Sequence, residues 1–231
     1  MHLNTAISWC LAWGDGLQPQ VDLKTLHQMR EAMAGKGQIP AAMHSYVEQA
    51  KALDKLPYPK TPDQLKALAN ENPELWESTI GLVYGGATKI KKYVFEAAKL
   101  QDIRGASALL DRINLVDLPA FFHAEDSDRF PQCQQSPGYC QQVRNLCLDA
   151  TDGAIGLAQA LIPELIVYST GGNILAFCPS AYVHQLANAI EKRYTQETLT
   201  ANSCAVGDTF RFLELRFGLL KDPIEQTNWL E

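Results

Sequence analysis

The first part of the chain repeats its apolar positions with the period of a helix. One clear series is spaced by three and four residues: Leu23, Leu26, Met29 and Met33. A second series begins at Met43, and prolines at 57, 59 and 62 then interrupt the pattern and indicate a turn or linker. We therefore predict a mostly helical N-terminal region over residues 1–78.

From residue 79 the pattern changes to short apolar runs that end at glycines. Four strands are predicted, over residues 79–84, 165–169, 173–178 and 203–206. The second and third form a hairpin that turns at Gly171-Gly172. Helices are predicted over residues 89–100, 107–113, 181–194 and 209–220, with Gly105 breaking the helical pattern between the first two.

The predicted elements from 79 to 207 follow the order β-α-β-β-α-β. This is the ferredoxin-like order, in which both helices cover one face of an antiparallel sheet. The expected fold class is therefore α+β, with a ferredoxin-like domain over residues 79–231. Residues 123–150 are polar, rich in glutamine and interrupted by two prolines, so we expect an irregular insertion or long loop there.

Composition and charge narrow the classes of function. Hydrophobic residues make up 46% of the 231 positions and charged residues 20%, which fits a folded domain and excludes a mostly disordered chain. The net charge is −6, so binding of long nucleic acids through bulk charge is not expected. Residues 88–112 are an exception, because six basic residues there face only three acidic ones.

Cysteines, histidines and the N-terminus indicate a cytoplasmic protein without a metal site. None of the six cysteines forms a Cys-x-x-Cys pair, and the five histidines do not cluster. The thiols therefore fit a reducing compartment. The start of the chain lacks the basic residues of a signal peptide. The uncharged stretch 165–190 is broken by glycines and a proline, so no membrane segment is expected.

Two glycine-rich segments are the candidates for binding chemistry. Gly85-Gly86-Ala87-Thr88-Lys89 lies where a strand is predicted to give way to a helix, a place that favours phosphate or simply forms a tight turn. Gly171-Gly172-Asn173 lies at the predicted hairpin tip, where two-metal enzymes of similar fold carry carboxylates. Because Thr88 and Asn173 are neutral and poor ligands for hard divalent ions, no catalytic residue is predicted.

A basic segment follows the first glycine pair. Its candidates for contact with RNA phosphates or an acidic partner are Lys89, Lys91, Lys92, Lys99 and Arg104. The alternative is a solvated helix face held by pairs such as Lys92–Glu96.

Both segments belong to longer blocks that resemble one family. Residues 85–96 (Gly-Gly-Ala-Thr-Lys-Ile-Lys-Lys-Tyr-Val-Phe-Glu), then Lys99-Leu100 and Ile103-Arg104-Gly105-Ala106-Ser107, resemble the start of the first palm domain in the large subunit of type III CRISPR-Cas effector complexes. Residues 168–176 (Tyr-Ser-Thr-Gly-Gly-Asn-Ile-Leu-Ala) resemble the second and third strands of the same palm. The resemblance covers about residues 79–210.

This resemblance implies an RNA-guided antiviral complex. Its partners would be guide RNA, target RNA, the small subunit and the subunit that caps the 5′ end of the guide. Many family members convert ATP to cyclic oligoadenylates, and ATP with Mg or Mn is implied for a complete subunit. The nucleotide-binding residues implied for this chain are Gly85, Gly86, Thr88, Gly171, Gly172 and Asn173.

The chain also departs from the family pattern. It has no His-Asp dipeptide and no Gly-Gly-Asp-Asp motif, and Ala87-Thr88 stand where an acidic residue is frequent. We therefore expect a degenerate palm that acts as scaffold and partial nucleotide pocket, within a longer subunit. The alternatives are a nucleotidyl transferase completed by a second palm, and a stand-alone ferredoxin-like module that binds nucleotides.

Overall fold

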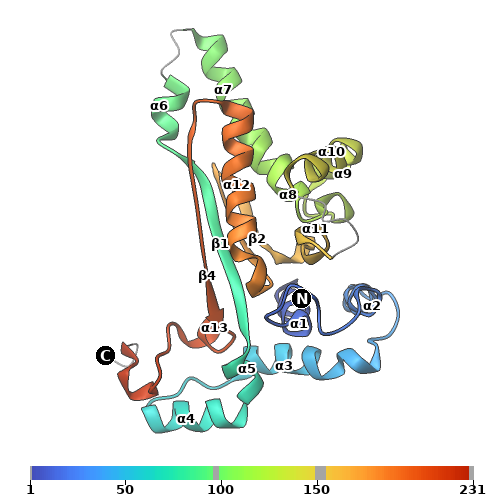
Figure 1. Cartoon of the computed structure of the whole chain (residues 1–231), viewed down its shortest axis with the longest axis vertical. Helices are drawn as coiled ribbons and strands as arrows, with labels where there is room; N and C mark the ends of the chain where they lie inside the picture. Colours follow the sequence, from blue (N-terminus) through green and yellow to red (C-terminus); the bar gives the residue numbers. More distant parts are fainter. Residues whose placement is uncertain (1, 96–98, 149–154, 229–231) are drawn as a thin grey trace. The chain divides into compact units, whose positions relative to one another are not determined.

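The computed structural model of the chain describes residues 2–95, 99–148 and 155–228 (Figure 1). The chain divides into two compact units. Unit 1 comprises Met1–Gly81, Pro179–Ala181 and Thr209–Glu231, and unit 2 comprises Leu82–Cys178 and Tyr182–Asp208. Each unit is described by itself. The division of the sequence into domains at residue 78 stays a prediction.

Unit 1 is mainly helical, as the spacing of its apolar residues predicts. Its main elements are α1 (His2–Trp13), α2 (Leu23–Met33), η1 (Ala41–Met43), α3 (His44–Lys55), α4 (Pro62–Glu71), α5 (Pro73–Glu77), α13 (Glu214–Phe217) and η6 (Ile224–Gln226). Trp9 and Trp13 of α1 are fully buried, as is Met29 of α2. Thr61 caps the start of α4, because its hydroxyl accepts a hydrogen bond from the Gln64 amide at 3.3 Å.

A four-stranded antiparallel sheet lies mostly in unit 2. Its strands are β1 (Thr79–Thr88), β2 (Ile166–Thr170), β3 (Asn173–Cys178) and β4 (Asn202–Arg211), in the order β2-β3-β1-β4. The predicted hairpin is confirmed: Thr170 pairs with Asn173, and Gly171 and Gly172 have φ of 62° and 90°. Two successive positive φ angles suit a two-residue turn between twisted strands. The protein is therefore of the α+β class.

Helix α12 (Val183–Thr198) lies against the sheet (Figure 1). A Cβ on Gly85 of β1 would meet Ile190 of α12 at 2.9 Å, and one on Gly207 of β4 would meet Val183 at 2.6 Å. Glycine at these two strand positions therefore lets the helix approach the sheet closely. The predicted helix over 181–194 is confirmed in its central part and continues one turn further.

Two strand predictions were too short. β1 continues through Gly85-Gly86 to Thr88, because both glycines are paired strand residues that neighbouring chain segments approach closely. β4 continues to Arg211, so the predicted helix over 209–220 is wrong except for the short α13. At the end of this strand, the Glu214 carboxylate accepts a hydrogen bond from the Arg211 backbone amide at 2.7 Å.

The helical connection after β1 also differs from its prediction. α6 covers Ile90–Phe95 and α7 covers Leu100–Arg112, so Gly105 lies inside a helix rather than between two. A Cβ there would meet no atom within 4 Å, and glycine costs a solvent-exposed helix only about 1 kcal/mol. Tertiary context therefore outweighs the low helix propensity of this residue.

The segment 123–150 was predicted to be irregular, and this is wrong for its described residues. It contains η3 (Ala124–Asp126), α9 (Pro131–Gln134) and α10 (Pro137–Cys147). Both α helices begin with a proline at a first-turn position, where no backbone N–H is needed. α10 buries residues spaced by three and four: Cys140, Val143 and Cys147.

Shorter elements complete unit 2. They are the π-helix η2 (Ile113–Asp117), α8 (Leu118–Ala120), α11 (Leu157–Ala160), η4 (Pro163–Leu165) and η5 (Ser180–Tyr182), the last shared with unit 1. In the described part of the chain, every helix is too short or too polar to cross a bilayer.

Candidate functional site

The two glycine-rich segments meet in the structure. A Cβ on Gly86 of β1 would lie 2.3 Å from the carbonyl oxygen of Gly172 and 2.4 Å from Oδ1 of Asn173. Contacts this short do not occur for real side chains, so position 86 requires glycine while the hairpin tip is in place. Three of the six predicted nucleotide-binding residues, Gly86, Gly172 and Asn173, are thus in contact although they lie far apart in sequence.

The Gly172 carbonyl fixes the hairpin tip against β1 and α12. It accepts a hydrogen bond from the Ala87 amide at 2.9 Å and lies 3.1 Å from the Tyr194 hydroxyl. That hydroxyl also lies 2.9 Å from Oδ1 of Asn114. Burial raises the pKa of Tyr194 to about 12, so the phenol keeps its proton and can donate to these acceptors at neutral pH.

Asn114 joins the π-helix η2 to the same region. Its carbonyl oxygen accepts from the Ser169 hydroxyl of β2 at 2.5 Å, and its side-chain amide donates to the Leu110 carbonyl at 2.7 Å. Asn114 is almost fully buried, so its side-chain hydrogen bonds provide partners for polar atoms that water does not reach. Hydrogen bonds through Tyr194 and Asn114 therefore connect the hairpin tip to η2 and α12.

A buried ion pair lies next to these residues. Arg193 of α12 donates from Nε and Nη2 to Oδ2 of Asp117, at 2.9 and 2.7 Å, and the two residues are 2% and 0% exposed. Tyr139 donates to the other oxygen of Asp117 at 3.0 Å, and Glu197 lies 2.8 Å from Nη1 of Arg193. Arg112 also pairs with Glu197. Burial opposes the charge on Arg193, but the attraction and hydrogen bonds of the Asp117 carboxylate, together with the attraction of Glu197, outweigh burial and raise the pKa of the guanidinium.

The other predicted nucleotide-binding residues lie apart from the Gly86 contact. Gly85 faces the opposite side of β1, where a Cβ would meet Ala205 at 2.8 Å. Gly171 lies at the open end of the hairpin, with no atom within 4 Å of a Cβ built there. Thr88 is exposed at the end of β1. A bound nucleotide remains a prediction, and close packing with the hairpin itself accounts for glycine at position 86.

The five predicted basic contact residues are all exposed. Lys89 precedes α6, Lys91 and Lys92 lie on it, Lys99 caps α7, and Arg104 lies on α7. Their exposure leaves their charges available to a partner. Glu96, the predicted partner of Lys92, lies outside the described residues.

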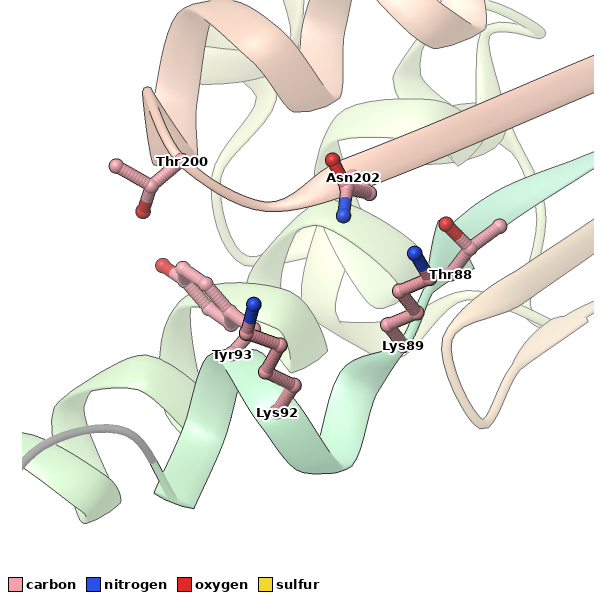
Figure 2. A pocket seen from close by; sticks show the side chains of 6 residues that line it. All are labelled: Thr88, Lys89, Lys92, Tyr93, Thr200 and Asn202. Atoms are coloured by element: carbon pink, nitrogen blue, oxygen red, sulfur yellow. The ribbon is translucent and has the colours of Figure 1, made fainter.

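A polar cavity opens at the junction of β1 and α6. Its volume is about 240 Å³, and it is lined by Thr88, Lys89, Lys92, Tyr93, Thr200 and Asn202. Figure 2 shows the side chains of α6 on one side and the start of β4 on the other. Thr88, Lys89 and Lys92 were among the predicted site residues, whereas Tyr93, Thr200 and Asn202 were not. Thr200 and Asn202 follow α12 by sequence, so no local pattern places them beside α6.

A second cavity lies in unit 1 and is mainly apolar. Its volume is about 400 Å³, and it is lined by the proline-rich segment 57–60 and by α4. The Arg216 guanidinium lies 4.8 Å from the ring centroid of Tyr58 and donates to the Leu56 carbonyl, which holds this segment in place. None of the predicted site residues lines this cavity.

The cysteines of α9 and α10 behave as buried apolar groups. Burial raises the pKa of Cys133, Cys140 and Cys147 above the usual range of a thiol, so they are protonated at neutral pH. Within the residues that the structure describes, no three His, Cys, Asp or Glu side chains gather as they would around a metal ion.

Comparison of the chain with protein-family models, with curated proteins and with solved structures found no match.

Proposed function

We propose that unit 2 is a degenerate palm in the large subunit of an RNA-guided type III CRISPR-Cas effector complex, where it serves as scaffold. The contact between Gly86 and the hairpin tip carries this proposal. The resemblance rests on two blocks around Gly85-Gly86 and Gly171-Gly172. Their contact in three dimensions supports treating them as parts of one site rather than as two unrelated glycine-rich segments.

The sheet supports the same proposal. Along the chain, several helices follow β1, then come β2, β3, α12 and β4. Across the sheet, the strands lie in the order β2-β3-β1-β4. This order is the one expected of a ferredoxin-like palm, in which the hairpin strand β3 pairs with the first strand. Many unrelated functions use this arrangement, so the sheet supports the fold and the glycine contact supports the family.

The side chains around the hairpin favour a scaffold over a catalytic centre. Thr88 and Asn173 stand where two-metal enzymes of this fold hold divalent ions, and both are neutral. Hard cations bind preferentially to several carboxylate oxygens, so this donor set does not fit two Mg or Mn ions. We therefore assign no catalytic step to this chain, and any conversion of ATP would depend on a second palm.

The exposed basic residues supply a contact surface for the complex. Lys91 of α6, Lys99 just before α7 and Arg104 of α7 are exposed, and the acidic residue Asp102 lies between the last two. A local positive field attracts RNA phosphates or an acidic subunit, although the whole chain is acidic. We propose that this face meets guide RNA or the subunit that caps its 5′ end.

The experiment is purification of the tagged full chain from its native cell under gentle conditions. We expect RNA of uniform guide length and several further subunits to copurify. A triple variant, Lys91→Glu, Lys99→Glu and Arg104→Glu, should reduce the retained RNA by at least about tenfold, because each reversal turns an attraction into a repulsion. The matched control reverses three exposed lysines of unit 1: Lys24, Lys36 and Lys55.

Two outcomes would contradict this proposal. One is recovery of a lone monomer without RNA. The other is equal loss of RNA in the control variant, which would mean that net charge rather than the basic face determines binding. Conversion of ATP by the isolated chain with Mg or Mn would instead favour the nucleotidyl transferase.

A further inference from the structure

The cavity between α6 and the start of β4 has a lining of uniform chemical character. Each of its six residues contributes a hydroxyl, an amide or an ammonium group: Thr88, Lys89, Lys92, Tyr93, Thr200 and Asn202. None of them is acidic, and two are cationic. Such a lining favours an anion that accepts several hydrogen bonds over an apolar or cationic ligand.

The side chains of the cavity converge from two elements. Figure 2 shows the Lys89 ammonium and the Asn202 amide nitrogen turned toward the same space, with Lys92 and Tyr93 of α6 beside it. Among the described residues, neither Lys89 nor Lys92 forms an ion pair with a carboxylate. Both lysines line the cavity, and neither has a carboxylate counterion among the described residues.

Lys89 has an unusual backbone conformation at the edge of the cavity. Lys89 has φ of 53°, a left-handed conformation that is unfavourable for residues with a Cβ. A glycine would adopt it with less strain, yet the position holds a long cationic side chain. This conformation lies between the end of β1 at Thr88 and the start of α6 at Ile90, and Lys89 and Lys92 both line the cavity there.

The size of the cavity limits the ligand. A volume of about 240 Å³ is below the range of roughly 300–1,000 Å³ that is usual for pockets enclosing a drug-sized ligand. A phosphate or diphosphate group fits this space, whereas a complete nucleotide would extend out of it. The lining therefore suits the phosphate end of a ligand rather than its base.

We propose that this cavity is a binding site for a diphosphate group, with Lys89 and Lys92 as the cationic contacts and Asn202 as the neutral donor. The site lies on the β4 side of β1, and the hairpin tip with Asn173 belongs to the β3 side. The proposal does not rest on a role in a CRISPR complex, because it follows from the cavity and its lining alone.

Isothermal titration of the full chain with sodium diphosphate, at fixed ionic strength near 0.1 M, tests the proposal. We expect one diphosphate per chain. The double variant Lys89→Gln with Lys92→Gln should weaken binding by at least about tenfold, since it removes two charge-assisted contacts. Asn202→Ala changes no charge of the protein and should weaken binding about tenfold, as expected for one hydrogen bond to an ionised acceptor.

The matched control is Lys91→Gln with Lys99→Gln, which removes two exposed charges near the cavity but outside its lining. It should change affinity less than about twofold, because neither side chain lines the cavity and a charge that does not contact the ligand is screened by salt. Circular dichroism of each variant verifies that it is folded. A control variant that binds as weakly as Lys89→Gln with Lys92→Gln would overturn the proposal, as would a flat titration of the unmodified chain with millimolar diphosphate.

Titration with adenosine diphosphate tests whether the site prefers free diphosphate or the diphosphate group of a nucleotide. An affinity within about threefold of that for diphosphate supports a site that contacts the phosphates alone. Binding of adenosine diphosphate by a chain that does not bind diphosphate would overturn it. Retention of guide RNA and binding of diphosphate are separate measurements, so failure of either proposal leaves the other standing.

Discussion

Arg193 and Asp117 form a buried ion pair in which two guanidinium nitrogens donate to a single carboxylate oxygen, at 2.9 and 2.7 Å. The two residues lie 76 positions apart and connect α12 to the π-helix η2. Burying two charges is costly unless the geometry is good and the remaining hydrogen-bonding groups are satisfied. Here Tyr139 and Glu197 supply the additional contacts, so the pair fixes η2 to α12.

Removing the carboxylate should destabilise unit 2. Asp117→Leu leaves the Arg193 guanidinium buried with Glu197 as its remaining acidic partner, and we expect a loss of about 3 kcal/mol in the free energy of unfolding. The exchange rates of β3 backbone amides with deuterium measure this loss in unit 2. Tryptophan fluorescence is unsuitable, because Trp9, Trp13, Trp76 and Trp229 all belong to unit 1.

The double variant Asp117→Leu with Arg193→Met is the control for this pair. It removes both charges and keeps similar volumes, so it should be more stable than Asp117→Leu alone. If the double variant loses the sum of the two single losses, the residues do not interact energetically and the ion pair is refuted as a source of coupling.

Tyr194→Phe should change the dependence of stability on pH. Near pH 7 the variant loses a buried hydrogen bond to Asn114 or Gly172, and we expect it to be about 1 kcal/mol less stable. The folded pKa of Tyr194 is raised by burial to about 12, whereas an unfolded tyrosine titrates near 10. Above pH 10 the unfolded state therefore releases a proton that the folded state keeps, and the stability of the unmodified protein falls.

This proton linkage gives the sign of the effect. The contribution of the Tyr194 phenol is fully present below pH 10 and is lost as the pH rises toward 12, by about 1.4 kcal/mol for each pH unit. The difference between the protein and Tyr194→Phe should thus shrink to about zero by pH 11. Urea unfolding followed by circular dichroism at each pH measures this difference. A difference that is constant from pH 8 to 11 would contradict the raised pKa.

The hairpin and α12 could be predicted from sequence because their signals are local. Gly171-Gly172 between two apolar runs indicates a two-residue turn, and the apolar residues Leu186 and Ile190 mark the buried face of α12. The same spacing reaches Arg193, a charged residue at a position where the pattern predicts an apolar one. That mismatch was the available signal for a buried ion pair.

The partners of these residues could not be predicted. Asn114 and Asp117 lie in an otherwise mainly apolar run, and their contacts come from α12 about 80 residues later. Gly86 was interpreted as the end of a strand because glycine is common in turns. Glycine is required there because the hairpin tip, which is distant in sequence, packs against this position. Contacts of this kind depend on how strands pair, and no periodicity within one segment reports that.

Replacing Gly86 and Gly105 by alanine should change the stability of the protein in opposite directions. Gly86→Ala forces a Cβ against the backbone of Gly172 and the side chain of Asn173, and we expect a loss of about 3 kcal/mol in the stability of unit 2. Gly105→Ala lies in α7 with open space around it and should gain up to about 1 kcal/mol from helix propensity. Urea unfolding followed by circular dichroism compares the two. Equal stabilities for both variants would refute the close contact of Gly86 with the hairpin.

Replacing Lys89 by glycine should raise the stability of the fold and weaken the binding of diphosphate. Because Lys89 has φ of 53°, Lys89→Gly relieves left-handed strain and should raise the stability of unit 2 by about 1 kcal/mol. Lys91→Gly, in the helical conformation of α6, should lower it by about the same amount. Thermal unfolding followed by circular dichroism measures both changes, and titration with diphosphate should show weaker binding only for Lys89→Gly. A Lys89→Gly variant that is less stable than the unmodified protein would mean that the lysine side chain, rather than the backbone turn, holds the junction of β1 and α6 together.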